Sequence, residues 1–198
     1  MFYKVLVGII RVLMRLVFRI NVIGKENMPK DGGAIIASNH RSNWDPVVVA
    51  ITTPRKLTFM AKAELFKNKL IADVLKAIGA FPIKRGSGDV GAIKAALTIL
   101  KNEDAMLIFP EGTRVTDESK SEAKPGAVML AIRAKVPVVP VYTSGKYRWF
   151  SKVTVTFGKP VYYEEYYGEK LSVEQLQELS NELLATMRSY KVLEKEGQ

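Results

Sequence analysis

The chain has 198 residues, of which 47% are hydrophobic and 25% are charged, and its formal net charge is +10. This length and composition are typical of one globular domain and argue against a disordered chain. The sequence has no cysteine and one histidine, which excludes disulfides, thiolate nucleophiles and cysteine-based zinc sites and argues against a transition-metal site. The excess of positive charge favours an anionic partner, such as a phosphate, an acidic lipid or a nucleic acid.

Residues 1–23 are mostly apolar but contain four cations, Lys4, Arg11, Arg15 and Arg19. On a helix these cations fall within a wedge of roughly 80°. A membrane-spanning helix is disfavoured, because each Arg at mid-membrane costs about 2.5–3.5 kcal/mol. A signal peptide is also disfavoured, since no uninterrupted apolar core or small-residue cleavage site is present. The pattern predicts an amphipathic helix in the membrane interface, ahead of a domain over residues 24–198. The alternative is an ordinary amphipathic helix packed on that domain.

The next distinctive stretch is residues 39–45, which follows a buried-strand run at residues 33–37. It holds His40, the only histidine, and Asp45, which directly precedes Pro46. An imidazole beside a carboxylate can act as a general base, because the carboxylate fixes the ring tautomer and stabilises the cation. The alternative is structural, with Asp45 as a helix N-cap and Pro46 as the first helical residue.

A short strand is expected at residues 56–60, a helix at 62–77 and a strand at 77–83. Gly86, Gly88 and Gly91 then form a Gly-x-Gly-x-x-Gly pattern between this strand and a helix at 89–101. Such a pattern can bind a dinucleotide, and Glu111 stands about where the acidic partner is expected. The alternative is a tight strand-to-helix turn, which uses glycines for the same conformational reason.

A second polar turn follows the buried-strand run at residues 105–109. It contains Glu111, Gly112, Thr113 and Arg114. Arg114 offers a bidentate fork for phosphate, Thr113 a hydroxyl, and Gly112 a backbone that a ligand can approach closely. The alternative is a turn with a surface arginine.

The remaining elements are a helix at 127–134, strands at 136–141 and 152–157, and a closing helix at 171–190. Between the two strands, residues 146–150 mix cations with aromatic residues, which suits a membrane interface, a nucleic acid or the tip of a hairpin. Strands alternating with helices predict an α/β fold. We expect a single-domain α/β sandwich with a mostly buried mixed sheet flanked by helices. The two polar turns should lie on the same side of that sheet.

Four sequence blocks together resemble those of the glycerolipid acyltransferases, in order and in separation. They are NHRSNWD at 39–45, GAFPIKR at 79–85, FPEGTR at 109–114 and VPVVPV at 136–141. The likeness is strongest to the bacterial 1-acylglycerol-3-phosphate acyltransferases. It implies transfer of a fatty acyl group from a thioester of acyl carrier protein or coenzyme A to the sn-2 hydroxyl of lysophosphatidic acid, giving phosphatidic acid.

The resemblance also implies roles for individual residues. His40 would be the general base and Asp45 its orienting partner. The acceptor phosphate would be bound by Lys84, Arg85, Glu111, Gly112, Thr113 and Arg114. The expected partners are an anionic membrane surface, lysophosphatidic acid and the acyl donor, with no nucleic acid, metal or cofactor. The expected location is the cytoplasmic face of the bacterial inner membrane, with the protein peripheral or monotopic.

The residues agree with this chemistry. Acyl transfer to an alcohol needs a base for the alcohol proton and donors for the developing oxyanion. Neither a Gly-x-Ser-x-Gly elbow nor a cysteine is present, so direct attack by the acceptor hydroxyl is favoured over an acyl-enzyme. Two competing hypotheses are a dinucleotide-dependent enzyme using residues 86–91 and a non-enzymatic binder of acidic lipid or nucleic acid.

Overall fold

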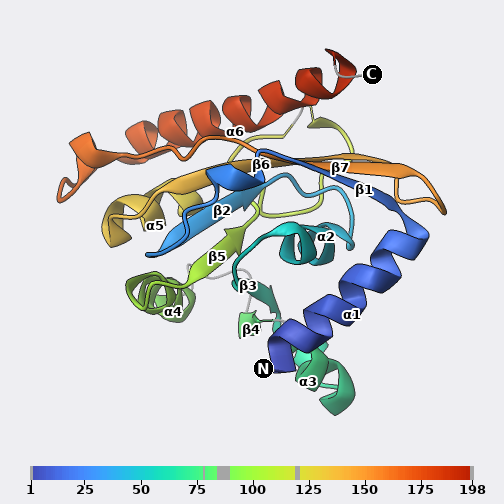
Figure 1. Ribbon diagram of the computed structural model, residues 1–198. Helices are drawn as coiled ribbons and strands as arrows, with labels where there is room; N and C mark the ends of the chain where they lie inside the picture. Colours follow the sequence, from blue (N-terminus) through green and yellow to red (C-terminus); the bar gives the residue numbers. More distant parts are fainter. Residues whose placement is uncertain (1, 78, 84–89, 119–120, 197–198) are drawn as a thin grey trace.

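A computed structural model describes residues 2–77, 79–83, 90–118 and 121–196 (Figure 1). Its α-helices are α1 (Phe2–Val17), α2 (Asp45–Thr52), α3 (Lys69–Ala77), α4 (Val90–Lys101), α5 (Gly126–Ala134) and α6 (Val173–Glu196). Its strands are β1 (Arg19–Ile23), β2 (Ala34–Ser38), β3 (Leu57–Lys62), β4 (Ala80–Ile83), β5 (Ala105–Ile108), β6 (Val138–Gly145) and β7 (Lys152–Phe157). Short 3-10 helices are η1 (Lys25–Asn27), η2 (Ala63–Phe66) and η4 (Glu164–Tyr166).

Within the described residues, seven strands form one mixed sheet in the order β1-β7-β6-β2-β5-β3-β4. The five strands from β6 to β4 run parallel to one another. The last two run the other way, because β7 pairs antiparallel with β6 while β1 pairs parallel with β7. The carboxyl ends of β2 and β5 are therefore neighbours, and the polar turns that follow them meet at one edge of the sheet.

Alternate residues of each strand face opposite sides of the sheet, so two cores form. In β2, Ala34 and Ile36 pack on one side with residues of α1 and α2, while Ile35 and Ala37 pack on the other side with α4, α5 and α6. Figure 1 shows α6 across one side of the sheet and α1, α2 and α3 on the other. The predicted α/β sandwich with a buried mixed sheet is confirmed.

Helix α1 has two apolar faces. One face is buried against the domain through Val7 and Met14, and Phe18 continues it beyond the helix end. The other face is exposed, with 53–66% of each of these side chains accessible: Val5, Ile9, Val12, Leu13 and Leu16. A helical wheel places these two faces roughly opposite each other. Packing on the domain therefore uses only part of the apolar surface of α1.

The predicted helical segment over residues 1–23 is wrong at its end. Helix α1 stops at Val17, and residues Arg19–Ile23 form strand β1, paired with β7 along its whole length. The apolar residues Ile20 and Val22 continue the apolar character of the helix, so composition does not mark the change to a strand. Residues 19–23 belong to the sheet and not to a separate membrane segment.

Three other boundaries differ from the predictions. The helix expected over 62–77 is split into η2 and α3, and Asn68 Oδ1 accepts the Ile71 amide at the start of α3 (3.2 Å). Strand β6 begins after Pro137 and runs on to Gly145, beyond the predicted end at residue 141. Helix α6 begins at Val173 because Ser172 and Gln175 exchange side-chain to backbone hydrogen bonds at its start.

Among the described residues, no helix is both long enough and apolar enough to cross a bilayer.

Candidate active site

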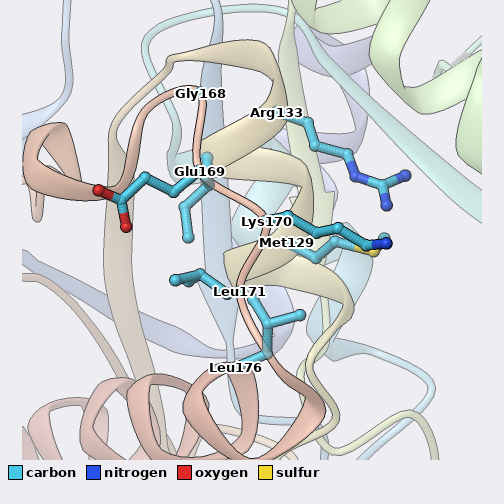
Figure 2. A pocket seen from close by; sticks show the side chains of 8 residues that line it. Met129, Arg133, Gly168, Glu169, Lys170, Leu171 and Leu176 are labelled. Carbon is cyan, nitrogen blue, oxygen red and sulfur yellow. The ribbon is translucent and has the colours of Figure 1, made fainter.

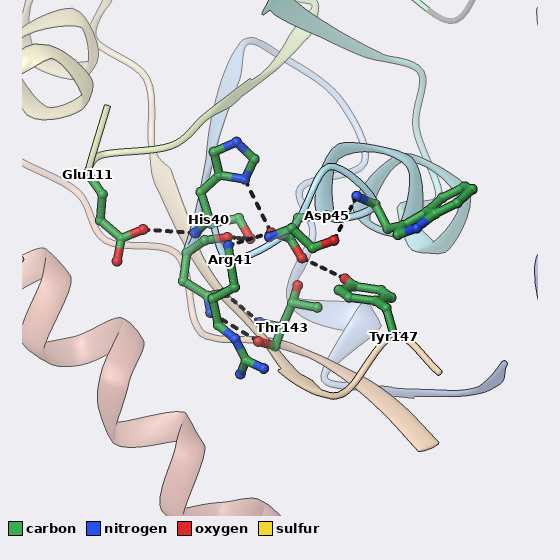
Figure 3. Close-up of polar contacts among 10 residues, drawn as sticks. His40, Arg41, Asp45, Glu111, Thr143 and Tyr147 are labelled. Atoms are coloured by element: carbon green, nitrogen blue, oxygen red, sulfur yellow. Dashed lines mark hydrogen bonds and ion pairs between the residues drawn. The ribbon is translucent and has the colours of Figure 1, made fainter. Parts of the chain in front are cut away.

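The turn after β2 is built around the carboxylate of Asp45, which is 1% exposed. Its Oδ2 accepts the backbone amides of Arg41 (2.6 Å) and Ser42 (2.5 Å). The same oxygen lies 3.2 Å from Nδ1 of His40. Trp44, not Asp45, occupies the N-cap position of α2 and makes no side-chain cap. The carboxylate therefore fixes the backbone of this turn through the Arg41 and Ser42 amides. It also faces the imidazole, the arrangement that a base–carboxylate pair requires (Figure 3).

The His40 ring has a defined orientation. It stacks on Phe109 at a centroid distance of 4.1 Å and an interplanar angle of 22°. Because Nδ1 faces Asp45, the opposite nitrogen Nε2 is the one left to accept a proton from a substrate. The side chain of His40 is 13% exposed, so the ring is largely shielded but reachable.

A tyrosine distant in sequence completes this arrangement. Tyr147, in the hairpin between β6 and β7, donates its hydroxyl to Oδ1 of Asp45 (2.6 Å). In Figure 3 Asp45 lies between His40 and Tyr147. Burial raises the pKa of the Tyr147 hydroxyl far above its usual value, and the charge of Asp45 raises it further. Tyr147 therefore stays protonated and donates to the carboxylate that faces the imidazole.

The hairpin and the turn are joined by two more side chains. The buried amide of Asn39 donates to the carbonyl of Thr143 (3.0 Å) and accepts its amide (2.7 Å). Arg41 donates to the carbonyl of Gly145 (2.6 Å). These bonds fix the His40 turn against the end of β6, the strand that leads into Tyr147.

The second polar turn contacts the first directly. Glu111 Oε2 accepts the backbone amide of His40 (2.8 Å), and the Val115 amide donates to the His40 carbonyl (2.8 Å). This confirms that the two turns lie on the same side of the sheet. Glu111 is 4% exposed, and burial raises its pKa, although the His40 amide and the charge of Arg188 partly oppose this. Its carboxylate supports the His40 backbone instead of facing outward toward a ligand.

The other predicted phosphate-binding residues differ in their placement. Thr113 and Arg114 are exposed beside the His40 turn. Gly112 has φ +70°, a left-handed conformation that favours glycine. A Cβ there would lie 2.7 Å from the end of the Lys124 side chain, so Lys124 extends over this turn. Lys84 and Arg85 lie outside the described residues, as do Gly86 and Gly88 of the glycine pattern.

Sequence reasoning did not single out Tyr147, Phe109 or Lys124 as contributors to this site. Phe109 was visible only as the last residue of a buried-strand run, and Tyr147 only as one of several aromatic residues in a basic loop. A polar Asn39 in an apolar setting was the one usable signal, since a buried amide needs partners.

A separate pocket of about 300 Å³ lies between α5 and the segment leading into α6 (Figure 2). It is lined by Met129, Ile132, Arg133, Gly168, Glu169, Lys170, Leu171 and Leu176. It contains no imidazole, because His40 is the only histidine of the chain. General-base chemistry by histidine is therefore confined to the His40 turn.

Comparison with known proteins places the chain within a family. Residues 19–144 match the family model described as Acyltransferase. The chain is 36% identical over 144 residues to a Bacillus subtilis protein named 1-acyl-sn-glycerol-3-phosphate acyltransferase, covering 72% of this chain and 71% of that one. It is 37% identical over 139 residues to a Streptococcus pneumoniae protein of the same name, covering 67% of this chain and 51% of that one.

A solved structure also resembles the fold. It is the Thermotoga maritima 1-acyl-sn-glycerophosphate acyltransferase, with a TM-score of 0.68 over 94% of this chain and 79% of that chain. The sequence identity is 24%, so this likeness supports the fold alone.

Proposed function

The chain belongs to the acyltransferase family, and we propose that it acylates the sn-2 hydroxyl of 1-acylglycerol-3-phosphate to give phosphatidic acid. The donor is a fatty acyl thioester of acyl carrier protein or coenzyme A. The observation that carries this proposal is the His40–Asp45 pair, with Nδ1 and Oδ2 3.2 Å apart on a turn braced from two other segments. The names of the two bacterial relatives support the choice of substrate.

The proposed reaction is a direct transfer. Nε2 of His40 removes the proton of the acceptor hydroxyl as its oxygen attacks the thioester carbonyl carbon. The C–O bond forms, the C–S bond breaks, and the proton on His40 passes to the departing thiolate. Asp45 holds the ring with Nδ1 protonated and stabilises the imidazolium that forms in between.

We assign the acceptor phosphate to the exposed cations beside the His40 turn. Arg114 is exposed on the turn that bonds to His40 through Val115, and Lys124 extends over Gly112 of that turn. A guanidinium and an ammonium at this place would hold a phosphate a short distance from the base. Glu111 is excluded from this role, because its carboxylate is buried and accepts the His40 amide.

We further propose that α1 docks on an anionic bilayer. Its free apolar face, from Val5 to Leu16, has no partner within the described residues, and Arg15 lies beside it on the helix surface. A helix of this kind lies in the plane of the interface. Because α1 ends at Val17, close to the hairpin that carries Tyr147, docking would bring the site to the surface where lysophosphatidic acid resides.

The test is a mixed assay with lysophosphatidic acid in vesicles and palmitoyl donors on both carriers. Released thiol can be measured with a colour reagent without background from the enzyme, since the chain has no cysteine. We expect phosphatidic acid to form in step with thiol release. A 1-acylglycerol acceptor that lacks the phosphate should react much more slowly. If no donor and acceptor pair gave turnover, the proposal would be wrong and a non-enzymatic lipid binder would account better for the basic surface.

A further inference from the structure

The hairpin between β6 and β7 exposes two large aromatic side chains at its tip. Trp149 is 76% exposed and Phe150 is 66% exposed, and their ring centroids lie 6.4 Å apart. Single exposed apolar residues are common on protein surfaces, but an adjacent pair of large rings on a hairpin tip marks an interaction surface.

The tip has a fixed backbone conformation. The hydroxyl of Ser151 accepts the Arg148 amide (3.1 Å) and lies within hydrogen-bonding distance of the carbonyls of Arg148 and Lys146. Phe150 has φ +60°, a left-handed conformation that is unfavourable for a bulky non-glycine residue. Backbone strain of this kind persists only where surrounding contacts impose it, and it concentrates at functional sites. The hydrogen bonds of Ser151 therefore fix the backbone that carries the two exposed rings.

The tip lies beside the end of α1, the helix that carries the free apolar face. The Phe150 amide donates to the Val17 carbonyl at the end of α1 (2.7 Å), and the Arg19 amide donates to the Ser151 carbonyl (2.9 Å). The last exposed residues of α1, Leu13 and Leu16, are 56% and 66% exposed. Two segments that are distant in the sequence, and that both expose apolar side chains, are therefore neighbours.

The charged residues of the hairpin itself all have one sign. Lys146, Arg148 and Lys152 belong to the hairpin, Arg19 lies beside it, and residues 143–163 contain no acidic residue. Exposed aromatic rings flanked by cations fit the head-group region of an anionic bilayer, where Trp is favoured and each nearby cation adds attraction.

We propose that this hairpin tip is a second lipid contact, with Trp149 and Phe150 entering the head-group region of an anionic bilayer. The inference rests on the proposed function, in which α1 is the first contact. A single helix lying in the interface leaves the domain free to roll about the helix axis. A second contact beside its end removes this freedom. The same hairpin carries Tyr147, which bonds Asp45, so the lipid contact and the candidate base are held in one fixed relation.

The first test uses the two tryptophans of the chain, Trp44 and Trp149. In a Trp44→Phe variant Trp149 is the only indole. We expect its emission to shift to the blue on vesicles that contain phosphatidylglycerol, and to be quenched by lipids brominated near the head group. Unchanged emission on such vesicles would overturn the proposal. A blue shift without vesicles that grows with protein concentration would also overturn it, since it would indicate contact with a second copy.

The second test removes both rings in a Trp149→Ser, Phe150→Ser variant. The matched control is Tyr162→Ser, because Tyr162 is 52% exposed and follows Val161, which pairs with the start of β6 at the other edge of the sheet. We expect the double variant to bind anionic vesicles at least about tenfold more weakly and the control to bind as the wild type does. Wild-type binding by the double variant would overturn the proposal.

Activity separates this proposal from the proposed function. Acyl transfer by the double variant should fall on acceptor in vesicles but stay near the wild-type rate on a short-chain acceptor that is soluble as a monomer. An equal decrease in the acyl-transfer rate of the double variant on both acceptors would overturn the proposal that the hairpin contacts lipid. If the wild type were inactive on both acceptors, the proposed acyl transfer would be wrong. The vesicle binding of the double variant would then still show whether the hairpin contacts lipid.

Discussion

Asp45 is the residue on which the candidate site is centred. It is fully buried, faces the His40 ring with Oδ2, and receives the Tyr147 hydroxyl on Oδ1. A buried carboxylate is costly unless its oxygens are satisfied, and here two backbone amides share that role. The charge that orients the imidazole is thus stabilised by groups from two distant parts of the chain.

Tyr147→Phe should lower kcat while leaving KM for both substrates nearly unchanged. The hydroxyl donates to Asp45 and so acts on the reaction through the His40 ring. Loss of a hydrogen bond to a charged group costs about 1.5–3 kcal/mol, so we expect at least about a tenfold decrease. Steady-state kinetics measure both constants. Tyr142→Phe is the matched control, because the Tyr142 hydroxyl bonds Glu118 instead. A Tyr147→Phe enzyme with the wild-type kcat would show that this bond does not support the base.

Glu111→Gln should change how stability depends on pH. Burial raises the pKa of Glu111 in the folded protein, so its contribution to stability is fully present below the unfolded pKa near 4.5 and is lost as pH rises through the folded pKa. The free energy of unfolding of the wild type, relative to the variant, should therefore be larger at pH 4 than at pH 8. Denaturant titrations at both values measure it.

Glu118→Gln provides a control with the opposite sign. Burial raises the pKa of Glu118, but hydrogen bonds from Lys191 and Tyr142 outweigh this and leave it lowered. Its contribution is present above the unfolded pKa and is lost as pH falls through the folded one. The same pH trend in both variants would contradict these assignments.

Contacts between individual residues can be predicted from the sequence only when the two residues are close along the chain. His40 and Asp45 are five residues apart, so the pair is visible in a single turn. Tyr147 lies 102 positions from Asp45, and the Glu111 carboxylate lies 71 positions from the His40 amide it accepts. Such contacts depend on which strands become neighbours, so residue type and spacing pointed Glu111 toward a ligand instead.

Among the elements, α1 shows most clearly what a pattern can and cannot predict. Val7 and Met14 are buried on the domain, as the packed-helix alternative expected, while the opposite face stays exposed. Docking of that exposed face on a membrane stays a prediction. Periodicity shows that a helix is apolar on two faces but not which face packs. The end of α1 at Val17 was missed because β1 is as apolar as the helix before it.

Val12→Asp with Leu16→Asp should weaken binding to anionic vesicles by at least about tenfold, because both changes place a carboxylate on the free face of α1. The melting temperature should hardly change, since these side chains are 60% and 66% exposed. Vesicle co-sedimentation and thermal melting measure the two effects. Val173→Asp, at another exposed valine, is the control. Undiminished binding by the double variant would count against α1 as the lipid contact.

For the whole molecule, the alternation of apolar strands and helices was sufficient to predict one α/β sandwich. The strand order was not predicted, because it depends on pairings between distant segments, such as β1 with β7. This pairing makes the N-terminal residues part of the sheet. From this pairing we infer that residues 1–23 do not form a unit independent of the domain.

A chain that begins at residue 24 should be strongly destabilised. It would lose the buried side chains of Val7, Met14 and Phe18, each worth about 1.5–3 kcal/mol when fully buried, and would expose the edge of β7. Thermal melting of both chains in one buffer, followed by circular dichroism, measures the effect. A chain from residue 24 that melts at the wild-type temperature would show that residues 1–23 are a detachable segment after all.

The central claim is that the His40 imidazole removes the proton from the acceptor hydroxyl. The most direct measurement compares the wild type with His40→Ala for thiol release and phosphatidic acid formation on lysophosphatidic acid vesicles. We expect the variant to lose transfer almost completely while keeping the wild-type circular dichroism spectrum and vesicle binding. A folded, vesicle-bound His40→Ala protein that still transferred the acyl group at a comparable rate would contradict the account.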